Sequence, residues 1–206
     1  MVSLFNKQRY ILSILLLFTF TGCGVLPSAN ATAPRTYLLD IISLDIPPAS
    51  PEGKTISVSM PQATAGFDTA AMIFIRQPYE LEAYSESQWV DTPSRLLLPL
   101  LVHRLEATGF FGAVLSSNTT SVVAELRLDT EIIRFQQEFL SDPSQVRLTL
   151  RTQLFDMASR NIVATKVFEI VEPSPSEDAA GGVIAANLAV KRLLDELAEF
   201  IIAQLS

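Results

Sequence analysis

Two segments of the chain alternate apolar and polar side chains with a period of two. Residues 126–132 place leucine, threonine and isoleucine on one side, and Asp129 and Glu131 on the other. Residues 146–154 repeat the pattern with Arg151 on the polar side. A β-strand with this pattern buries one face and exposes the other. We therefore predict two long antiparallel strands whose acids and arginines pair across the ladder, each pair contributing roughly 0.2 to 1 kcal/mol.

Shorter apolar runs predict the remaining strands. The turn signal Gln77-Pro78 separates two of these runs and predicts a hairpin. The apolar phase also shifts between Ile132 and Ile133, which indicates a bulge or the departure of that strand from the sheet. The shorter expected strands are residues 36–44, 55–60, 70–76, 79–84, 112–116 and 162–171.

A leucine-rich helix is expected after residue 92. Asp91 or Thr92 can accept the free amide protons of its first turn, and Pro93 lies where its missing amide costs least. Pro99 falls inside this helix and should bend its axis. Gly109 is placed to end the helix by adopting a positive φ.

The last segment predicts a second helix with one apolar stripe. Ser176 or Asp178 can cap it, and apolar residues then recur every three or four positions as far as Leu205. Together these elements predict an α+β fold: a small, mainly antiparallel sheet with two helices packed on one face.

The first 22 residues have the features of a secretion signal. Lys7 and Arg9 precede an apolar run, residues 10–20, which is too short to cross a bilayer because a span takes about 20 residues. Two small residues then precede Cys23, the only cysteine of the chain. This arrangement resembles a bacterial lipobox, although Phe20 stands where leucine is usual. Cys23 is therefore the expected lipidation site, carrying acyl chains such as palmitate.

The lipobox interpretation divides the chain into three parts. Residues 1–22 are the expected signal peptide, residues 23–35 the lipidated N-terminus and tether, and residues 36–206 one α+β domain. Gly24 stands where aspartate would be an inner-membrane retention signal, so we expect a lipid-anchored protein at the outer membrane, facing the periplasm. The alternative is an ordinary signal peptide with an unrelated cysteine, or an uncleaved N-terminal anchor.

The charge of the chain excludes one class of partner. The net charge is −7, and it becomes more negative when residues 1–22, which hold Lys7 and Arg9 but no acid, are removed. An acidic domain lacks the positive surface that nucleic acid binding requires. It also has no electrostatic reason to lie flat on anionic lipid, so membrane contact should run through the N-terminal lipid anchor.

The sequence offers few groups for catalysis. His103 is the only histidine, and on a leucine-rich helix it is more typical of a surface or boundary position than of a base. The motifs of serine hydrolases and zinc proteases do not occur, and Gly181-Gly182 lacks the lysine of a phosphate-binding loop. We expect no catalytic residue, no metal and no cofactor, and therefore no enzyme.

Three large aromatic residues gather before the first expected helix. Tyr79, Tyr84 and Trp89 lie within a polar stretch of the sequence. Amphipathic rings of this kind anchor protein interfaces, so these three residues are the candidate partner-binding site. Alternatively, they cover the seam between helix and sheet.

These residues belong to a set of short motifs that resembles the ABC-type transport auxiliary lipoprotein family. The family includes the lipoprotein of the paraquat-inducible intermembrane system, and the resemblance extends from Tyr37 to Leu205. The most specific feature of the resemblance is Trp89, which lies shortly before the leucine-rich helix. Pro99 and the long apolar run of residues 70–75 depart from the family pattern. The matching motifs are Phe67-Asp68-Thr69 through Ile75-Arg76, Glu82-Ala83-Tyr84, Gln88-Trp89-Val90-Asp91-Thr92-Pro93 and Gly109-Phe110-Phe111.

The resemblance implies a non-catalytic outer-membrane component of a transport system for lipids, solvents or toxicants. In such systems an inner-membrane ATPase and permease work with an MCE-domain protein that spans the periplasm. The lipoprotein would dock that MCE-domain protein at the outer membrane. The resemblance also implies a small antiparallel sheet with two helices on one face, and it allows assembly into a homo-oligomeric ring.

Two other functions stay open at this point. An assembly or structural lipoprotein would associate with an outer-membrane β-barrel. An anchored hydrolase would instead place acids around His103 in a cleft.

Overall fold

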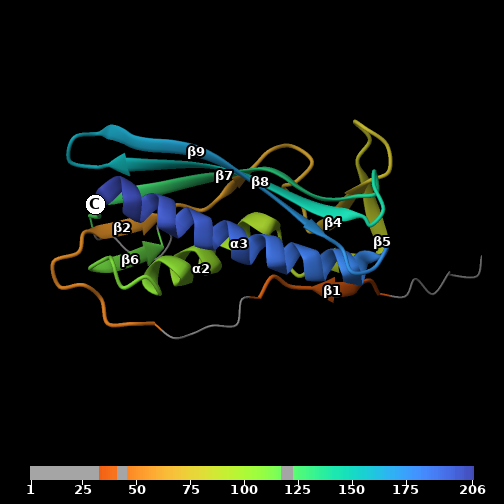
Figure 1. The fold of residues 1–206 in the computed structure, drawn as a ribbon, viewed down its shortest axis with the longest axis horizontal. Helices are drawn as coiled ribbons and strands as arrows, with labels where there is room; N and C mark the ends of the chain where they lie inside the picture. Colours follow the sequence, from red (N-terminus) through yellow and green to blue (C-terminus); the bar gives the residue numbers. More distant parts are fainter. Residues whose placement is uncertain (1–32, 41–45, 117–122) are drawn as a thin grey trace, which may run out of the picture. The chain divides into compact units, whose positions relative to one another are not determined.

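The chain forms a mixed β-sheet with two helices packed against it (Figure 1). The computed structural model describes residues 33–40, 46–116 and 123–206. Within them, nine strands belong to one sheet. The elements are β1 (Arg35–Tyr37), β2 (Thr55–Val58), β3 (Gln62–Ala63), β4 (Ala71–Ile75), β5 (Glu82–Trp89), α2 (Pro93–Glu106), β6 (Ala113–Ser116), β7 (Leu126–Glu138), β8 (Gln145–Asp156), β9 (Asn161–Pro173) and α3 (Ala179–Leu205).

A long antiparallel ladder of β7, β8 and β9 forms the largest part of the sheet. β7 pairs with β8 along its whole length, starting with Leu126 opposite Asp156, and β9 pairs with β8 over the same length. The two long alternating strands are thus confirmed. Glu131 lies 3.3 Å from Arg151 across this ladder, which confirms the expected pairing of acid and arginine. The register shifts directly after Ile132, so the phase shift in the sequence marks a bulge.

The shorter strands correct the expectation of a small, mainly antiparallel sheet. β2 lies between β6 and β7 and runs parallel to both. β4 runs parallel to the last residues of β7, and β1 runs parallel to β5. The sheet is therefore mixed. Alternation along a strand reports its buried face but not the direction of its neighbour, and long connections such as α2 permit parallel pairing.

Two strand boundaries also differ from expectation. β4 and β5 form the predicted hairpin, but β5 covers residues 82–89 rather than 79–84. The polar residues 85–88 therefore belong to a strand that ends at Trp89. β1 is shorter than the expected strand at residues 36–44, and residues 41–45 lie outside the described residues. So does the N-terminal part up to residue 32, including Cys23.

Both helices pack on the apolar face of the sheet and touch each other. Asp178 caps α3 by accepting a hydrogen bond from the amide of Gly181 at 2.8 Å, as expected. Pro93 is the first residue of α2, and Gly109 has a φ of 64° beyond its end. None of the helices in the described part of the chain has the length and apolarity needed to span a bilayer. The sheet residues beneath the helices are fully buried: Leu126, Leu128, Ile132, Leu148, Leu150 and Leu154.

The ladder gives the domain two distinct ends (Figure 1). At one, which we name the loop end, residues 76–81 join β4 to β5 and residues 139–144 join β7 to β8. At the other, the hairpin end, residues 157–160 join β8 to β9. β8 has 12 residues, so the two ends lie about 40 Å apart at the usual rise per residue.

A partly buried ion pair holds the ladder together at the loop end. The guanidinium of Arg147 contacts both carboxylate oxygens of Glu138, at 2.9 and 3.0 Å, and also reaches Glu169 at 2.8 Å. Gln136 and Gln145 donate further hydrogen bonds to Glu138. Burial alone would raise the pKa of Glu138, but the hydrogen bonds outweigh burial, and the pKa lies below its ordinary value.

Replacing one partner of this pair should destabilise the domain. Arg147→Met leaves the Glu138 carboxylate buried without its cation, and we expect a loss of about 3–5 kcal/mol in the free energy of unfolding by urea. The double variant Glu138→Leu/Arg147→Met should recover part of this loss. A double variant no more stable than Arg147→Met would contradict the assignment.

The same pair predicts acid sensitivity. Because the folded-state pKa of Glu138 is depressed, its contribution is present above the ordinary pKa of 4.5 and is lost as the pH falls through the folded-state value. Urea unfolding of Glu138→Gln should therefore depend less on pH below 4.5 than that of the unaltered chain.

Candidate functional site

The three candidate aromatic residues lie along one stretch of chain but on different surfaces. Tyr79 occupies the turn between β4 and β5, and its side chain is wholly exposed. Tyr84 is partly buried in β5, and Trp89 at the end of β5 is only 5% exposed. The structure therefore brings Tyr84 and Trp89 to the same interior region and leaves Tyr79 apart from them.

Trp89 connects β5 to the long ladder. Its ring stacks on Phe135 of β7, with centroids 5.5 Å apart and planes inclined by 15°. Its amide donates to the carbonyl oxygen of Ala70 at 2.8 Å. A buried stacked ring in this position favours the core alternative for Trp89, because the side chain has little surface left for a partner.

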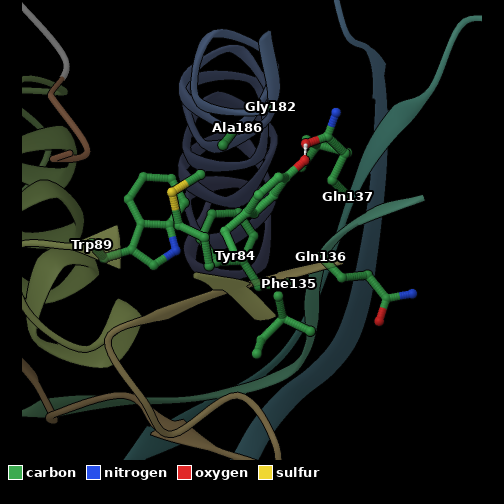
Figure 2. A pocket seen from close by; sticks show the side chains of 10 residues that line it. Tyr84, Trp89, Phe135, Gln136, Gln137, Gly182 and Ala186 are labelled. Atoms are coloured by element: carbon green, nitrogen blue, oxygen red, sulfur yellow. Dashed lines mark hydrogen bonds between the residues drawn. The ribbon is translucent and has the colours of Figure 1, made fainter. Parts of the chain in front are cut away.

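Tyr84 reaches β7 through a hydrogen bond to Gln137 (Figure 2). Its hydroxyl donates to Oε1 of Gln137 at 2.9 Å, and Nε2 of Gln137 donates to the hydroxyls of Ser144 at 3.0 Å and Ser174 at 3.4 Å. Burial first, and then the charge of Asp178, raise the pKa of Tyr84 to about 12. This polar joint ties the β4–β5 hairpin to the loop end of the ladder.

A glycine in α3 makes room for this polar joint. A Cβ on Gly182 would collide with Oε1 of Gln137, so the side chain can lie against the helix only because residue 182 has none. Gly182 therefore permits close packing of the Gln137 side chain against α3.

The cavity among these side chains is too small for a ligand. It measures about 20 Å³ and is lined by Tyr84, Trp89, Phe135, Gln137 and Gly182, among others. A volume of roughly 10–15 Å³ holds one water molecule, so the space suits a water and nothing larger. The site around Tyr84 and Trp89 therefore joins structural elements.

A wider recess lies on the face of the sheet away from the helices. It encloses about 530 Å³ and has a polar lining. Its charges are already paired: Arg127 contacts Asp129 at 3.0 Å, and Arg151 contacts Glu131 at 3.3 Å. Ser59 also donates to Asp129. This pairing leaves the recess without the excess charge that would attract an ionic substrate.

His103 lies on α2 beside the groove between the two helices. Its Nδ1 is 3.3 Å from Glu106, while Asp195 across the groove is held by Arg104 at 2.8 Å and Lys191 at 2.9 Å. Acids therefore do not converge on His103 in this groove. Among residues 33–40, 46–116 and 123–206, no group of three or more histidine, cysteine, aspartate or glutamate side chains is placed to hold a metal ion.

Exposed apolar side chains mark both ends of the ladder. At the hairpin end these are Met157, Ile162 and Val163, and at the loop end they are Leu81 and Leu140 beside Tyr79. The sequence alone does not single out the first five, because an isolated apolar residue near a turn has the same pattern as the edge of a core. Only the position of each turn in the fold shows which of them stay uncovered.

Comparison with protein families identifies one match. The family described as ABC-type transport auxiliary lipoprotein component matches residues 37–198. A comparison with the curated proteins finds no match.

Solved structures share the fold at low sequence identity. Protein XCC0632 from Xanthomonas campestris, described with family DUF330, is 20% identical with a TM-score of 0.69, covering 84% of this chain and 94% of that one. A second, uncharacterized protein is 11% identical with a TM-score of 0.65, covering 82% and 99%. The hypothetical protein CT253 from Chlamydia trachomatis is 10% identical with a TM-score of 0.51, covering 72% and 95%. At these identities the likeness is one of fold.

Removing the hydroxyl of Tyr84 tests the polar joint. Tyr84→Phe leaves Oε1 of Gln137 without its donor, and we expect a loss of about 1–3 kcal/mol in the free energy of unfolding at pH 8. Tyr79→Phe, at the exposed turn, is the matched control and should change stability by less than about 0.5 kcal/mol.

The two variants should also differ at alkaline pH. The pKa of Tyr84 is raised in the folded state, so its contribution is complete below the ordinary value of 10.0 and is lost as the pH rises towards about 12. The gap in stability between the unaltered chain and Tyr84→Phe should therefore narrow between pH 10 and pH 12. A constant gap would contradict this account of Tyr84.

Proposed function

Because the chain belongs to the family of ABC-type transport auxiliary lipoprotein components, we propose that it is the lipid-anchored outer-membrane component of such a transport system. The system would move lipids, solvents or toxicants between membranes. The family match carries the proposal, since residues 37–198 span nearly all of the described domain. The family is a class of transport auxiliary proteins and not a class of enzymes, so ATP hydrolysis would belong to another subunit.

Cys23 would supply the anchor. Proteins of a lipoprotein family are membrane-anchored, and Cys23 is the only cysteine of the chain, two small residues after an apolar segment. Two or more acyl chains hold a protein firmly at a bilayer, because each buried methylene contributes about 0.8 kcal/mol. Gly24 in place of aspartate supports the outer membrane as the destination.

The hairpin end would dock the partner, a periplasm-spanning MCE-domain protein. Met157, Ile162 and Val163 are exposed there, although apolar side chains of this size gain stability by burial. β9 pairs with β8 only, among the strands that the structure describes, so its outer edge can accept another strand. This end offers both apolar contact and backbone hydrogen bonds to a partner.

The length of the ladder supports docking of the partner at the hairpin end. The hairpin end lies about 40 Å from the loop end, given the 12 residues of β8. The described chain begins at Ala33 and enters the sheet through β1, which runs parallel to the last three residues of β5, so the chain before Arg35 is directed towards the loop end. A domain tethered near its loop end can present its hairpin end to a partner in the periplasm.

A charge placed on the hairpin end should weaken docking without unfolding the domain. Ile162 is about half exposed, so Ile162→Glu should change the free energy of unfolding by less than about 0.5 kcal/mol. Recovery of the MCE-domain protein with the affinity-purified lipoprotein from the native host should fall at least about tenfold, as expected for loss of one central apolar contact.

An equally exposed isoleucine provides the control for this experiment. Ile184→Glu alters α3, outside the hairpin end, and should leave recovery of the partner unchanged. Equal recovery with Ile162→Glu and Ile184→Glu would contradict docking at the hairpin end. Recovery of a β-barrel protein in place of the MCE-domain protein would contradict the proposed function itself.

Lipidation is tested separately by Cys23→Ser. This variant should lose incorporation of labelled palmitate and should leave the outer-membrane fraction. Label that persists in Cys23→Ser would show that the acyl chains are attached elsewhere.

A further inference from the structure

Three exposed apolar side chains gather at the loop end. Tyr79 and Leu81 belong to the turn between β4 and β5, and Leu140 belongs to the loop between β7 and β8; together we name them the apolar tip. The two segments are neighbours, because the amide of Phe139 donates to the carbonyl oxygen of Ile75 at 2.9 Å. The apolar tip is therefore one surface built from two turns.

The side chains beneath the apolar tip fix its position. Arg76 lies over the ring of Phe74 at 4.6 Å and pairs with Glu82 at 2.9 Å. The rings of Phe74 and Phe139 meet edge to face at 5.8 Å. These contacts link the two turns, so the apolar tip is held in place rather than free to fold back onto the domain.

The backbone of Tyr79 has an unfavourable conformation. Its φ is 70°, a value that bulky side chains rarely adopt. Its side chain is also wholly exposed, so burial within the domain does not offset that strain. A strained, uncovered aromatic side chain at the extreme of a fold is typical of a contact made with something outside the domain.

The direction of the chain before β1 indicates that the loop end lies on the side of the lipid anchor. β1 runs parallel to β5, with Arg35 opposite Ser87, and β5 itself starts from the turn that carries Tyr79. The chain before Arg35 is therefore directed towards the loop end. From Cys23 to Ala33 the chain can span at most about 35 Å, so a tether that starts on the side of the loop end allows this end to reach the bilayer.

We propose that the apolar tip inserts into the interface of the bilayer that anchors the chain, as a second membrane contact. The inference rests on the proposed lipidation of Cys23. Tyrosine and leucine are suited to this depth, where an aromatic ring meets headgroups and an aliphatic side chain meets acyl chains. Glu80 and Asp142 flank the apolar tip and are exposed, so the matching surface is a zwitterionic phospholipid rather than an anionic one.

Fluorescence quenching by brominated lipid tests this contact in the full acylated chain. Trp89 is the only tryptophan and is buried, so Tyr79→Trp adds one exposed fluorescent side chain. On vesicles of brominated phosphatidylcholine we expect roughly half of the added emission to be lost, as for a side chain 5–10 Å into the interface. Leu140→Trp provides a second reporter that does not depend on the strained turn.

The control reporter is Ile162→Trp at the hairpin end, whose added emission should stay unquenched. If the emission of Tyr79→Trp and that of Leu140→Trp are each the same on brominated and on ordinary vesicles, the inference is overturned. The occupant of the apolar tip would then be a protein partner.

Mass measurement of the same samples separates the two proposals. An unacylated Cys23 contradicts the proposed anchor, whereas an acylated chain without quenching contradicts the membrane contact alone.

Discussion

The antiparallel ladder of β7, β8 and β9 is the constraint on which the other features depend. Alternation in β7 and β8 buries one face of it on the side of the helices, where α3 packs on β8 and β9, and the 12-residue length of β8 separates two ends by about 40 Å. The shorter strands β2 and β4 attach to opposite ends of β7, in parallel. A shorter ladder would bring the apolar side chains of the two ends onto one surface and remove the distinction between them.

Partly buried polar contacts hold the loop end, and exposed apolar side chains mark the hairpin end. Glu138 with Arg147 joins β7 to β8, and Tyr84 with Gln137 fastens β5 to β7. The hairpin end instead presents Ile162 on an edge strand. This asymmetry suits a protein that is fixed at one end and recruits a partner at the other, as the proposed function requires.

Local patterns in the sequence predicted the elements better than their pairing. Alternation identified β7 and β8, and Asp178 identified the start of α3, because both signals depend on near neighbours in the chain. The parallel pairings and the partner of Tyr84, Gln137, depend on residues far apart in sequence. The three aromatic residues were grouped by their spacing, but the hairpin directs Tyr79 outwards and Trp89 into the core.

Cross-linking in cells of the native host tests the docking role most directly. Lys166 is exposed midway along the edge strand β9, on which the hairpin end lies, whereas Lys191 lies on α3 beside the groove with α2. The account predicts that amine-reactive links from Lys166 join the chain to an MCE-domain protein, with far fewer from Lys191. Links from Lys166 that lead only to outer-membrane β-barrel proteins would contradict the docking role. Equal numbers of links from Lys166 and Lys191 to the MCE-domain protein would contradict it as well.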